Sequence, residues 1–282
     1  FVSSNSRLML FEAMRNNIKT DLNDFINGLI EAVGPDGTII FPTFNWDFCK
    51  GITFDYKNTE SKTGSIGAIA LKRGDFKRTK HPIYSFAVYG KYQKELYEME
   101  NVDSFGLDSP FAFFKEKNVR NYIIDVSLCH CFTFTHFVEE HSGKANYRFI
   151  KDFTADYLDE NGECSTRTYS MFVRYLNLDV IATIDPIEKD LKEANAEREF
   201  KINSSVIKEI YLGKAYDILL NDIFNNKSRK LFCINALMLA AAAAIFFCVN
   251  CTPLGSPVVP VVNIISANSP SSGKTITSLS TK

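Results

Sequence analysis

Residues 20–44, TDLNDFINGLIEAVGPDGTIIFPTF, place a helix pattern directly before a strand pattern. Apolar side chains recur at helical spacing from Leu22 to Val33, with Thr20 or Asp21 available as the N-cap and Gly34 as the stop. After the turn GPDG, the run TIIFPTF is β-branched and aromatic, which is typical of a buried strand. A helix that leads straight into a buried strand predicts an α/β fold with a central mixed sheet flanked by helices.

The rest of the chain extends this pattern. A short helix is expected in residues 64–74, and strands in 81–91 and 119–128, the second leading into a helix that starts near Thr133. Residues 147–176 alternate over two runs around the turn DENGE, which predicts an antiparallel hairpin inserted in the fold. Residues 186–200 and 214–224 are expected to form charged helices with a solvated face.

The composition favours a globular protein that acts on a small molecule. With 45% hydrophobic residues the chain can bury a large core, and its 32 basic and 33 acidic residues nearly cancel, which argues against nucleic acid as a partner. Seven irregularly spaced cysteines indicate reduced thiols in the cytoplasm. The first residues, FVSSNS, resemble the end of a strand, so we expect the chain to be truncated at its N-terminus.

The composition changes after residue 230, which predicts three parts: an α/β domain in 1–230, a hydrophobic helix in 231–249 and a flexible Pro/Ser-rich tail in 250–282. The hydrophobic segment follows Lys227, Arg229 and Lys230 and has the length of a transmembrane span. Asn235 and its alanines fit a buried helix equally well. The predicted location is therefore cytoplasmic, with membrane attachment through 231–249 left open.

Residues 129–141, CHCFTFTHFVEEH, carry the side chains best suited to chemistry. Four side chains here are of zinc-ligand types: Cys129, His130, Cys131 and His136. This C-x-C at a strand end, however, lacks the second cysteine pair of a structural zinc site. On a helix, His136 lies one turn from Glu139, and a carboxylate on one imidazole nitrogen leaves the other free to act as a general base. A surface ion pair is the alternative interpretation of that spacing.

Several stretches, in order, resemble the aminoglycoside 3-N-acetyltransferases, including members not devoted to antibiotic resistance. They are FVSSNS, GLIEAVGPDGTIIFPTF, RTKHPIYSFAVYG, FGLDSPFA and FTFTHFVEE, and the resemblance covers about residues 1–232. It implies an N-acetyltransferase that moves acetyl directly from acetyl-coenzyme A to an amine of an aminoglycoside or related amino sugar, without a metal. His136 would be the general base and Glu139 would orient it.

The resemblance also suggests which residues line the cofactor and reaction cleft: Ser4, Thr43, His81, Ser85 and Ser109. Arg7, Arg78 and Lys80 are candidate partners for the coenzyme phosphates. Each of the five cleft positions has a structural alternative, such as a strand start at His81 or a turn at Ser109.

Two departures from the family pattern affect the acceptor. Tyr84 stands where many resistance members carry a histidine, and DVSLCHCF replaces a glycine-rich run. These changes favour an amino sugar or another small amine over antibiotic detoxification. The competing hypotheses are a membrane-attached scaffold without catalysis and, third, a metal-dependent hydrolase that uses Cys129, His130 and His136. The sequence leaves a homodimer open.

Overall fold

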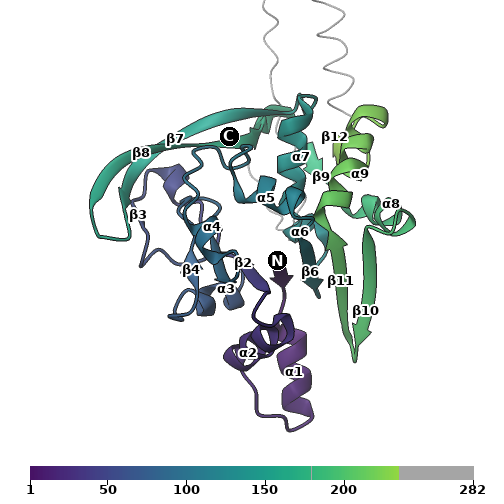
Figure 1. Ribbon diagram of the computed structural model, residues 1–282. Helices are drawn as coiled ribbons and strands as arrows, with labels where there is room; N and C mark the ends of the chain where they lie inside the picture. The colour runs from purple at the N-terminus through teal and green to yellow at the C-terminus, as the bar shows by residue number, and fades with distance from the viewer. Residues whose placement is uncertain (179, 235–282) are drawn as a thin grey trace, which may run out of the picture. The chain divides into compact units, whose positions relative to one another are not determined.

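The computed structural model describes residues 1–178 and 180–234, and its main sheet is mixed, as predicted (Figure 1). β1 runs parallel to β6, and β11 is antiparallel to β6 on one side and to β10 on the other. The strand order is β1-β6-β11-β10, with bounds Val2–Ser4, Arg120–Ile124, Ser205–Tyr211 and Glu197–Ile202.

Three smaller sheets complete the strand pairing. An antiparallel sheet has the order β2-β5-β4, with bounds Thr38–Pro42, Phe86–Gly90 and Lys77–Arg78. The predicted hairpin is β7 (Arg148–Leu158) and β8 (Cys164–Arg174), and β3 (Phe54–Asp55) pairs with β7 in parallel. The last sheet pairs β9 (Val180–Ala182) with β12 (Phe232–Ile234).

Helices surround these sheets, and α7 and α9 pack side by side (Figure 1). The α-helices are α1 (Arg7–Arg15), α2 (Leu22–Val33), α3 (Ser65–Ala70), α4 (Gln93–Tyr97), α5 (Pro110–Glu116), α6 (Leu128–Cys131), α7 (Phe134–Ser142), α8 (Glu188–Glu193) and α9 (Leu212–Asn225). Single 3-10 turns occupy Phe48–Lys50, Leu176–Leu178 and Asp185–Ile187.

Helix α2 begins and ends where the sequence predicts. The Asp21 carboxylate accepts the backbone N–H groups of Asn23 and Asp24, and Gly34 ends the helix at a φ of 66°. The apolar face of α2 packs on strand β2, and Ile26 of the helix and Phe41 of the strand belong to one hydrophobic cluster.

The larger core cluster is rich in phenylalanine. Phe86 makes edge contacts with Phe44, Phe111 and Phe114, with ring centroids 5.2 to 5.5 Å apart. These rings come from β5, α5 and the segment after β2, so aromatic packing joins the small antiparallel sheet to the helices around α7.

The charged helix expected in residues 186–200 is wrong in its second half. Helix α8 ends at Glu193, and residues from Glu197 onward form β10, paired along its length with β11. β10 is a sheet edge, where exposed charged side chains discourage pairing with other chains. The charges in residues 197–200 therefore belong to an edge strand and not to the solvated face of a helix.

The predicted hydrophobic helix of 231–249 also begins differently. Phe232–Ile234 is strand β12, antiparallel to β9, and Leu231 is buried in the main core. Residues 235–249 and the predicted tail in 250–282 lie outside the described residues. In the part of the chain that the structure describes, none of the helices combines the length and the apolar character that a bilayer-spanning segment needs.

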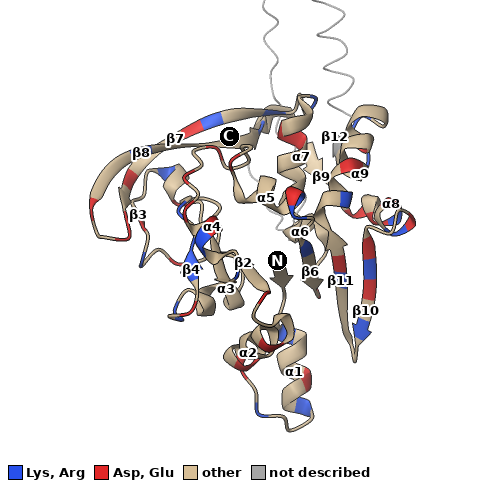
Figure 2. Cartoon of the chain, in the orientation of Figure 1, with Lys and Arg blue, Asp and Glu red and all other residues tan. Residues whose placement is uncertain are grey.

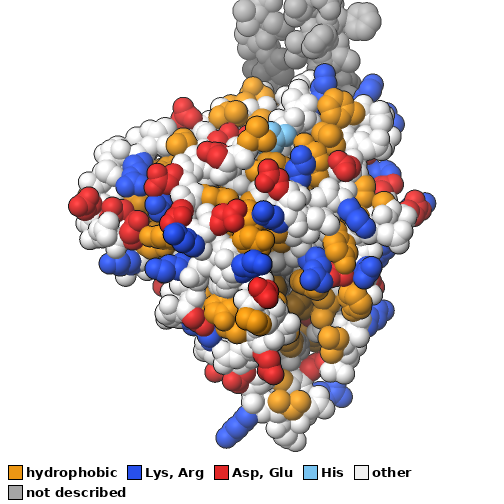
Figure 3. Space-filling view, in the orientation of Figure 1, with side chains coloured by type: hydrophobic (Ala, Val, Ile, Leu, Met, Phe, Trp, Pro, Cys, Tyr) orange, Lys and Arg blue, Asp and Glu red, His pale blue; other side chains and the backbone are white. Residues whose placement is uncertain are grey.

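Charges of both signs are interspersed over the fold. Figure 2 shows acidic and basic positions alternating along β10 and scattered over the other elements. The face shown in Figure 3 likewise carries red and blue side chains side by side, separated by small apolar areas. The outer surface on this face has no large region of a single sign.

Candidate active site

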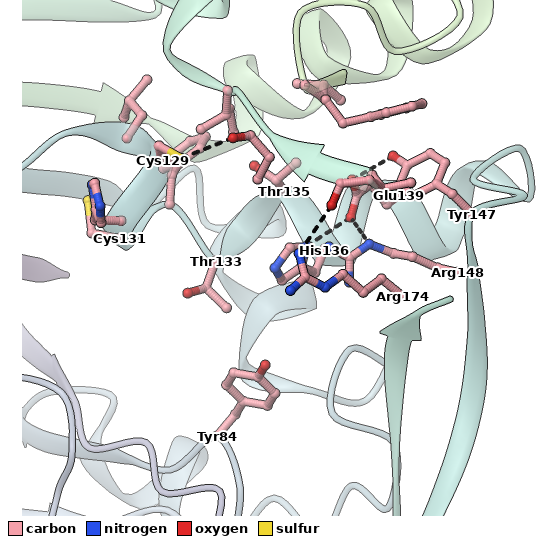
Figure 4. Close-up of a pocket in the computed structure, with 18 of the residues that line it drawn as sticks. Tyr84, Cys129, Cys131, Thr133, Thr135, His136, Glu139, Tyr147, Arg148 and Arg174 are labelled. Atoms are coloured by element: carbon pink, nitrogen blue, oxygen red, sulfur yellow. Dashed lines mark hydrogen bonds and ion pairs between the residues drawn. The ribbon is translucent and has the colours of Figure 1, made fainter. Parts of the chain in front are cut away.

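A cavity of about 200 Å³ lies beside helix α7 (Figure 4). Its walls come from α6, the first two turns of α7, the start of β7, the end of β8 and strand β9, together with Trp46 and Tyr84. These segments are far apart in the sequence and meet where the β7–β8 hairpin passes α7. The cavity therefore forms only in the folded chain.

His136 and Glu139 lie together in this cavity, one turn apart on α7. The Nδ1 atom of His136 is 2.8 Å from Oε2 of Glu139. The Glu139 side chain is 4% exposed, whereas that of His136 is 29% exposed. The carboxylate is therefore at the floor of the site, and the imidazole stands between it and the opening.

Two more groups hold the Glu139 carboxylate in place. The Tyr147 hydroxyl donates a hydrogen bond of 2.6 Å to Oε1, and Nε of Arg148 forms an ion pair of 2.8 Å with Oε2. Figure 4 shows both side chains converging on Glu139 from the start of β7. A buried carboxylate with three partners has a fixed orientation, so it can fix that of His136.

The pKa values of this pair favour a charged Glu139 and a neutral His136. Burial lowers the pKa of His136 below its ordinary value, and the nearby Arg148 charge adds to that effect. Burial alone would raise the pKa of Glu139, but hydrogen bonds from His136 and Tyr147, with the charges of His136 and Arg148, lower it overall. The pair thus keeps its carboxylate ionised and its imidazole neutral at neutral pH.

The tautomer of His136 follows from this arrangement. A carboxylate can only accept a hydrogen bond, so Nδ1 of His136 carries the proton and donates it to Glu139. Nε2 is then unprotonated, and among the described residues it has no hydrogen-bond partner. An imidazole in this state can accept a proton from a bound molecule.

Further polar groups reach the cavity. The Thr135 hydroxyl is buried and has no hydrogen-bond partner among the described residues. Arg174, the last residue of β8, extends its guanidinium beside that of Arg148 (Figure 4). Buried polar atoms normally have partners, so the Thr135 hydroxyl is a candidate contact for a ligand.

The five predicted cleft residues do not line this cavity. Thr43 and Ser85 are fully buried, with their hydroxyls 2.9 Å apart, and Nε of Arg78 donates to the Ser85 hydroxyl over 3.0 Å. Arg78 also donates to the carbonyl of Thr59, and its pKa is lowered to about 10 by burial. This cluster ties β2, β4 and β5 together, so the structure gives these three side chains an internal role.

The predicted residues Ser4, His81 and Ser109 have similar surroundings. The backbone N–H groups of Ile83 and Tyr84 donate to Nδ1 of buried His81, whose pKa burial lowers to about 3. Ser109 is the buried N-cap residue of α5, but its hydroxyl has no hydrogen-bond partner among the described residues, and Ser4 ends β1 half-buried. Their assignment to cofactor binding stays a prediction.

The two remaining candidates for coenzyme phosphates differ in exposure. Arg7 is exposed at the start of α1, whereas Lys80 donates to Glu100 over 2.7 Å. Neither residue lines the cavity. Both assignments stay predictions.

The C-x-C segment forms helix α6 rather than the end of a strand, because β6 stops at Ile124. Cys129 and Cys131 donate to the carbonyls of Ala182 and Ser127, respectively. Burial raises the pKa of both thiols. In residues 1–178 and 180–234, no three His, Cys, Asp or Glu side chains converge as a metal site would require, so the hydrolase hypothesis gains no support.

Sequence reasoning missed Tyr147, Arg148 and Arg174. The first two open the stretch YRFIKDF of the predicted hairpin, but no spacing rule links them to Glu139. Their position beside α7 depends on the path of the chain after Gly143, which ends α7 at a φ of 61°. Arg148 and Arg174 could have been predicted to lie opposite each other if the register of the hairpin had been known.

Comparison with solved structures shows that this fold is shared with acetyltransferases. Aminoglycoside acetyltransferase AAC(3)-Xa has 18% sequence identity and a TM-score of 0.62, over 74% of this chain and 81% of that one. The YokD protein from Bacillus subtilis has 19% identity and a TM-score of 0.59, over 74% and 82%. AAC-IIIb, solved as a binary complex with CoASH, has 14% identity and a TM-score of 0.61, over 73% and 84%.

The chain belongs to the aminoglycoside 3-N-acetyltransferase family, whose model matches residues 11–221. No curated protein matches it. Family membership confirms the resemblance found in the sequence and the enzyme class, an N-acetyltransferase. The ligand of the AAC-IIIb complex, CoASH, is the deacetylated form of the predicted donor, acetyl-coenzyme A.

Proposed function

We propose that this protein transfers the acetyl group of acetyl-coenzyme A to an amine of an aminoglycoside or related amino sugar, with His136 as the general base. The observation that carries the proposal is the hydrogen bond from His136 to a buried, three-partner carboxylate at the edge of a cavity. Family membership supports the reaction, and this geometry supports the assignment of the base.

The reaction requires little more from the protein than a general base and a fixed geometry of the two substrates. The amine nitrogen forms a bond to the acetyl carbon as the bond from carbon to sulfur breaks. Nε2 of His136 takes the proton that the amine loses, and the coenzyme A thiolate that leaves takes up a proton in turn. Glu139 orients the imidazole and stabilises its charged form while that proton is held.

The cavity suits the reacting ends of both substrates rather than either whole molecule. About 200 Å³ is the space of several water molecules, enough for an amine and a thioester in contact. Holding them about 3 to 3.5 Å apart is a large part of what an enzyme contributes to such a transfer. The Thr135 hydroxyl can donate to the carbonyl oxygen as negative charge develops on it.

The test is thiol release from acetyl-coenzyme A across a panel of amino sugars and aminoglycosides. We expect amine-dependent release, and His136→Ala should lower kcat by about 100- to 10,000-fold. His141→Gln is the matched control: His141 lies on the same helix but bonds to the Phe105 carbonyl outside the cavity. Thermal unfolding midpoints should be similar for the three proteins.

The pH dependence of kcat gives a second, independent signature of the base. Protonated His136 cannot accept a proton, so kcat should rise with pH through the histidine pKa. Burial lowers that pKa, so the midpoint should fall below about 6.5, the ordinary histidine value. Unchanged kcat in His136→Ala, or its loss in His141→Gln alone, would remove His136 from the mechanism.

A further inference from the structure

The charges that line the cavity do not balance. Among the described residues that line it, the single carboxylate is Glu139, which already has Arg148 and His136 as partners. Arg174 adds a second guanidinium, and among residues 1–178 and 180–234 no carboxylate lies within ion-pair distance of it. Its NH1 atom donates to the carbonyl of Val180 over 3.1 Å, which neutralises no charge. Among the described residues, which do not include Asp179, one cationic group therefore faces the cavity without a counter-charge.

The β7–β8 register places the two guanidiniums together. Arg148 and Arg174 are direct cross-strand partners, the first pair of the hairpin, so their side chains leave the same face of the ribbon. Figure 4 shows both reaching toward His136. Like charges directly opposite each other destabilise a strand pair, and one carboxylate offsets only one of them. An anion bound between them would offset the other.

This lining is unfavourable for a polycation. An aminoglycoside carries several ammonium groups, and a site selective for it needs carboxylates to receive them. Glu139, the one carboxylate in the described part of the lining, is buried behind His136 and already has three partners. The chain has a net charge of -1, and charges of both signs are mixed on the face shown in Figure 3, so the cationic excess is a local property of the cavity.

We propose that the acceptor is an amino sugar that also carries an acidic group, a carboxylate or a phosphate, which the Arg148–Arg174 pair binds while its amine faces His136. This rests on the proposed function and names the substrate class of the same site. A guanidinium matches the geometry of either oxyanion with two parallel hydrogen bonds. Arg174 is then a specificity-determining residue.

Trp46 supplies an apolar face for such a ligand and a way to observe it. It lines the cavity, is 37% exposed, and is the single tryptophan of the chain. An aromatic ring offers contact area to the apolar face of a sugar ring at little cost in conformational entropy. Its fluorescence therefore reports binding at this cavity without requiring acetyl transfer.

The first experiment measures binding to the full chain by Trp46 fluorescence. The probes are glucosamine 6-phosphate, glucosamine and sisomicin, which differ in charge. We expect glucosamine 6-phosphate to bind at least about tenfold more tightly than glucosamine, and sisomicin to bind more weakly than either. Arg174→Gln should abolish the preference for the phosphate, and Arg174→Lys should retain part of it.

Arg198→Gln is the matched control, because Arg198 is an arginine on edge strand β10 that does not line the cavity. It should keep the full preference, and all variants should unfold at similar temperatures. Tighter binding of sisomicin than of glucosamine 6-phosphate overturns the proposal. So does an Arg174→Gln variant that keeps the wild-type preference.

The second experiment separates an acidic acceptor from the phosphates of coenzyme A, which have the same chemistry. In the thiol-release assay, Arg174→Gln should raise KM for the phosphorylated acceptor by about tenfold and leave KM for acetyl-coenzyme A unchanged. If only the KM for acetyl-coenzyme A rises, with no change for S-acetylpantetheine, Arg174 serves the coenzyme and the proposal is wrong.

The two experiments also distinguish this inference from the proposed function. Charge-selective binding without thiol release from any amine would leave the anion site standing and refute acetyl transfer. Thiol release with a clear preference for sisomicin would support acetyl transfer and refute the acidic acceptor.

Discussion

Glu139 shows how a single buried side chain organises the candidate site. Removing a carboxylate from water is costly, and here that cost is offset by the Tyr147 phenol at Oε1 and by the His136 imidazole and the Arg148 guanidinium at Oε2. Because both of its oxygens are engaged, the carboxylate sets the tautomer of His136 and constrains the position of Arg148 at once. One residue thus links the proposed base to the proposed anion site.

The residue-scale prediction concerns Glu139→Gln. The amide keeps the size of the side chain but can present its NH2 group to Nδ1, which would select the wrong histidine tautomer. We expect kcat for thiol release to fall by about 100-fold or more. Glu140→Gln is the control, since Glu140 is the next residue on α7 but faces Asp103 instead of the cavity. Equal activity in both variants would show that Glu139 does not orient the base.

At the scale of elements, the approach of α3 to β2 depends on a glycine. A Cβ atom at Gly67 would lie 2.5 Å from the Pro42 carbonyl oxygen and 3.2 Å from the Thr43 methyl group. The helix can therefore pack on the end of β2 only because residue 67 has no side chain. Gly28, in the middle of α2, has open space around the same position.

These two glycines make a matched prediction. Gly28→Ala should stabilise the protein by about 0.5 to 1 kcal/mol, because alanine favours a helix and nothing opposes its methyl group. Gly67→Ala gains the same propensity but must displace backbone, so it should destabilise by about 1 to 3 kcal/mol. Urea unfolding of both variants measures the difference. Similar effects in the two helices would mean that α3 does not pack on β2 this closely.

At the scale of the whole molecule, a large aromatic core stabilises the fold, and a few buried acids reduce that stability at high pH. Phenylalanine rings from several helices and strands meet in one cluster, which provides the main apolar burial. Burial and the neighbouring Asp103 raise the pKa of Glu140 to about 8, and burial with the charge of Glu188 raises that of Glu197 to about 7. These acids hold protons in the folded chain that they release when it unfolds.

The sign of the pH effect follows from that difference. A raised folded-state pKa means that the free energy of unfolding falls as pH rises from the ordinary glutamate value toward 8. Glu140→Gln removes this contribution, so variant and wild type should be similar near pH 5. By pH 9 the variant should be more stable by about 1 to 2 kcal/mol, less than full linkage because the side chain is partly exposed. Urea unfolding of both proteins at pH 5 and at pH 9 measures this change. If the difference in unfolding free energy between variant and wild type is the same at both pH values, Glu140 is solvated in the folded chain.

Much of the fold could be predicted because its signals are local. The cap at Asp21, the stop at Gly34 and the apolar run of β2 are each encoded within a few residues. The β10–β11 hairpin was not predicted, because charges on an edge strand and on a helix face look alike in sequence. The dyad of His136 and Glu139 was predictable for the same local reason, since i and i+3 meet on any helix.

The sequence by itself determined the family, and also helix α2, strand β2, the β7–β8 hairpin and the helical spacing of His136 and Glu139, which depend on residues close together in the chain. Only the tertiary structure decided that Tyr147, Arg148 and Arg174 join that dyad, and that Thr43 and Ser85 are internal. The reason is that charge balance and burial depend on strand register and on how the hairpin passes α7. These contacts join residues that are far apart in the sequence, and no periodic pattern in the sequence indicates them.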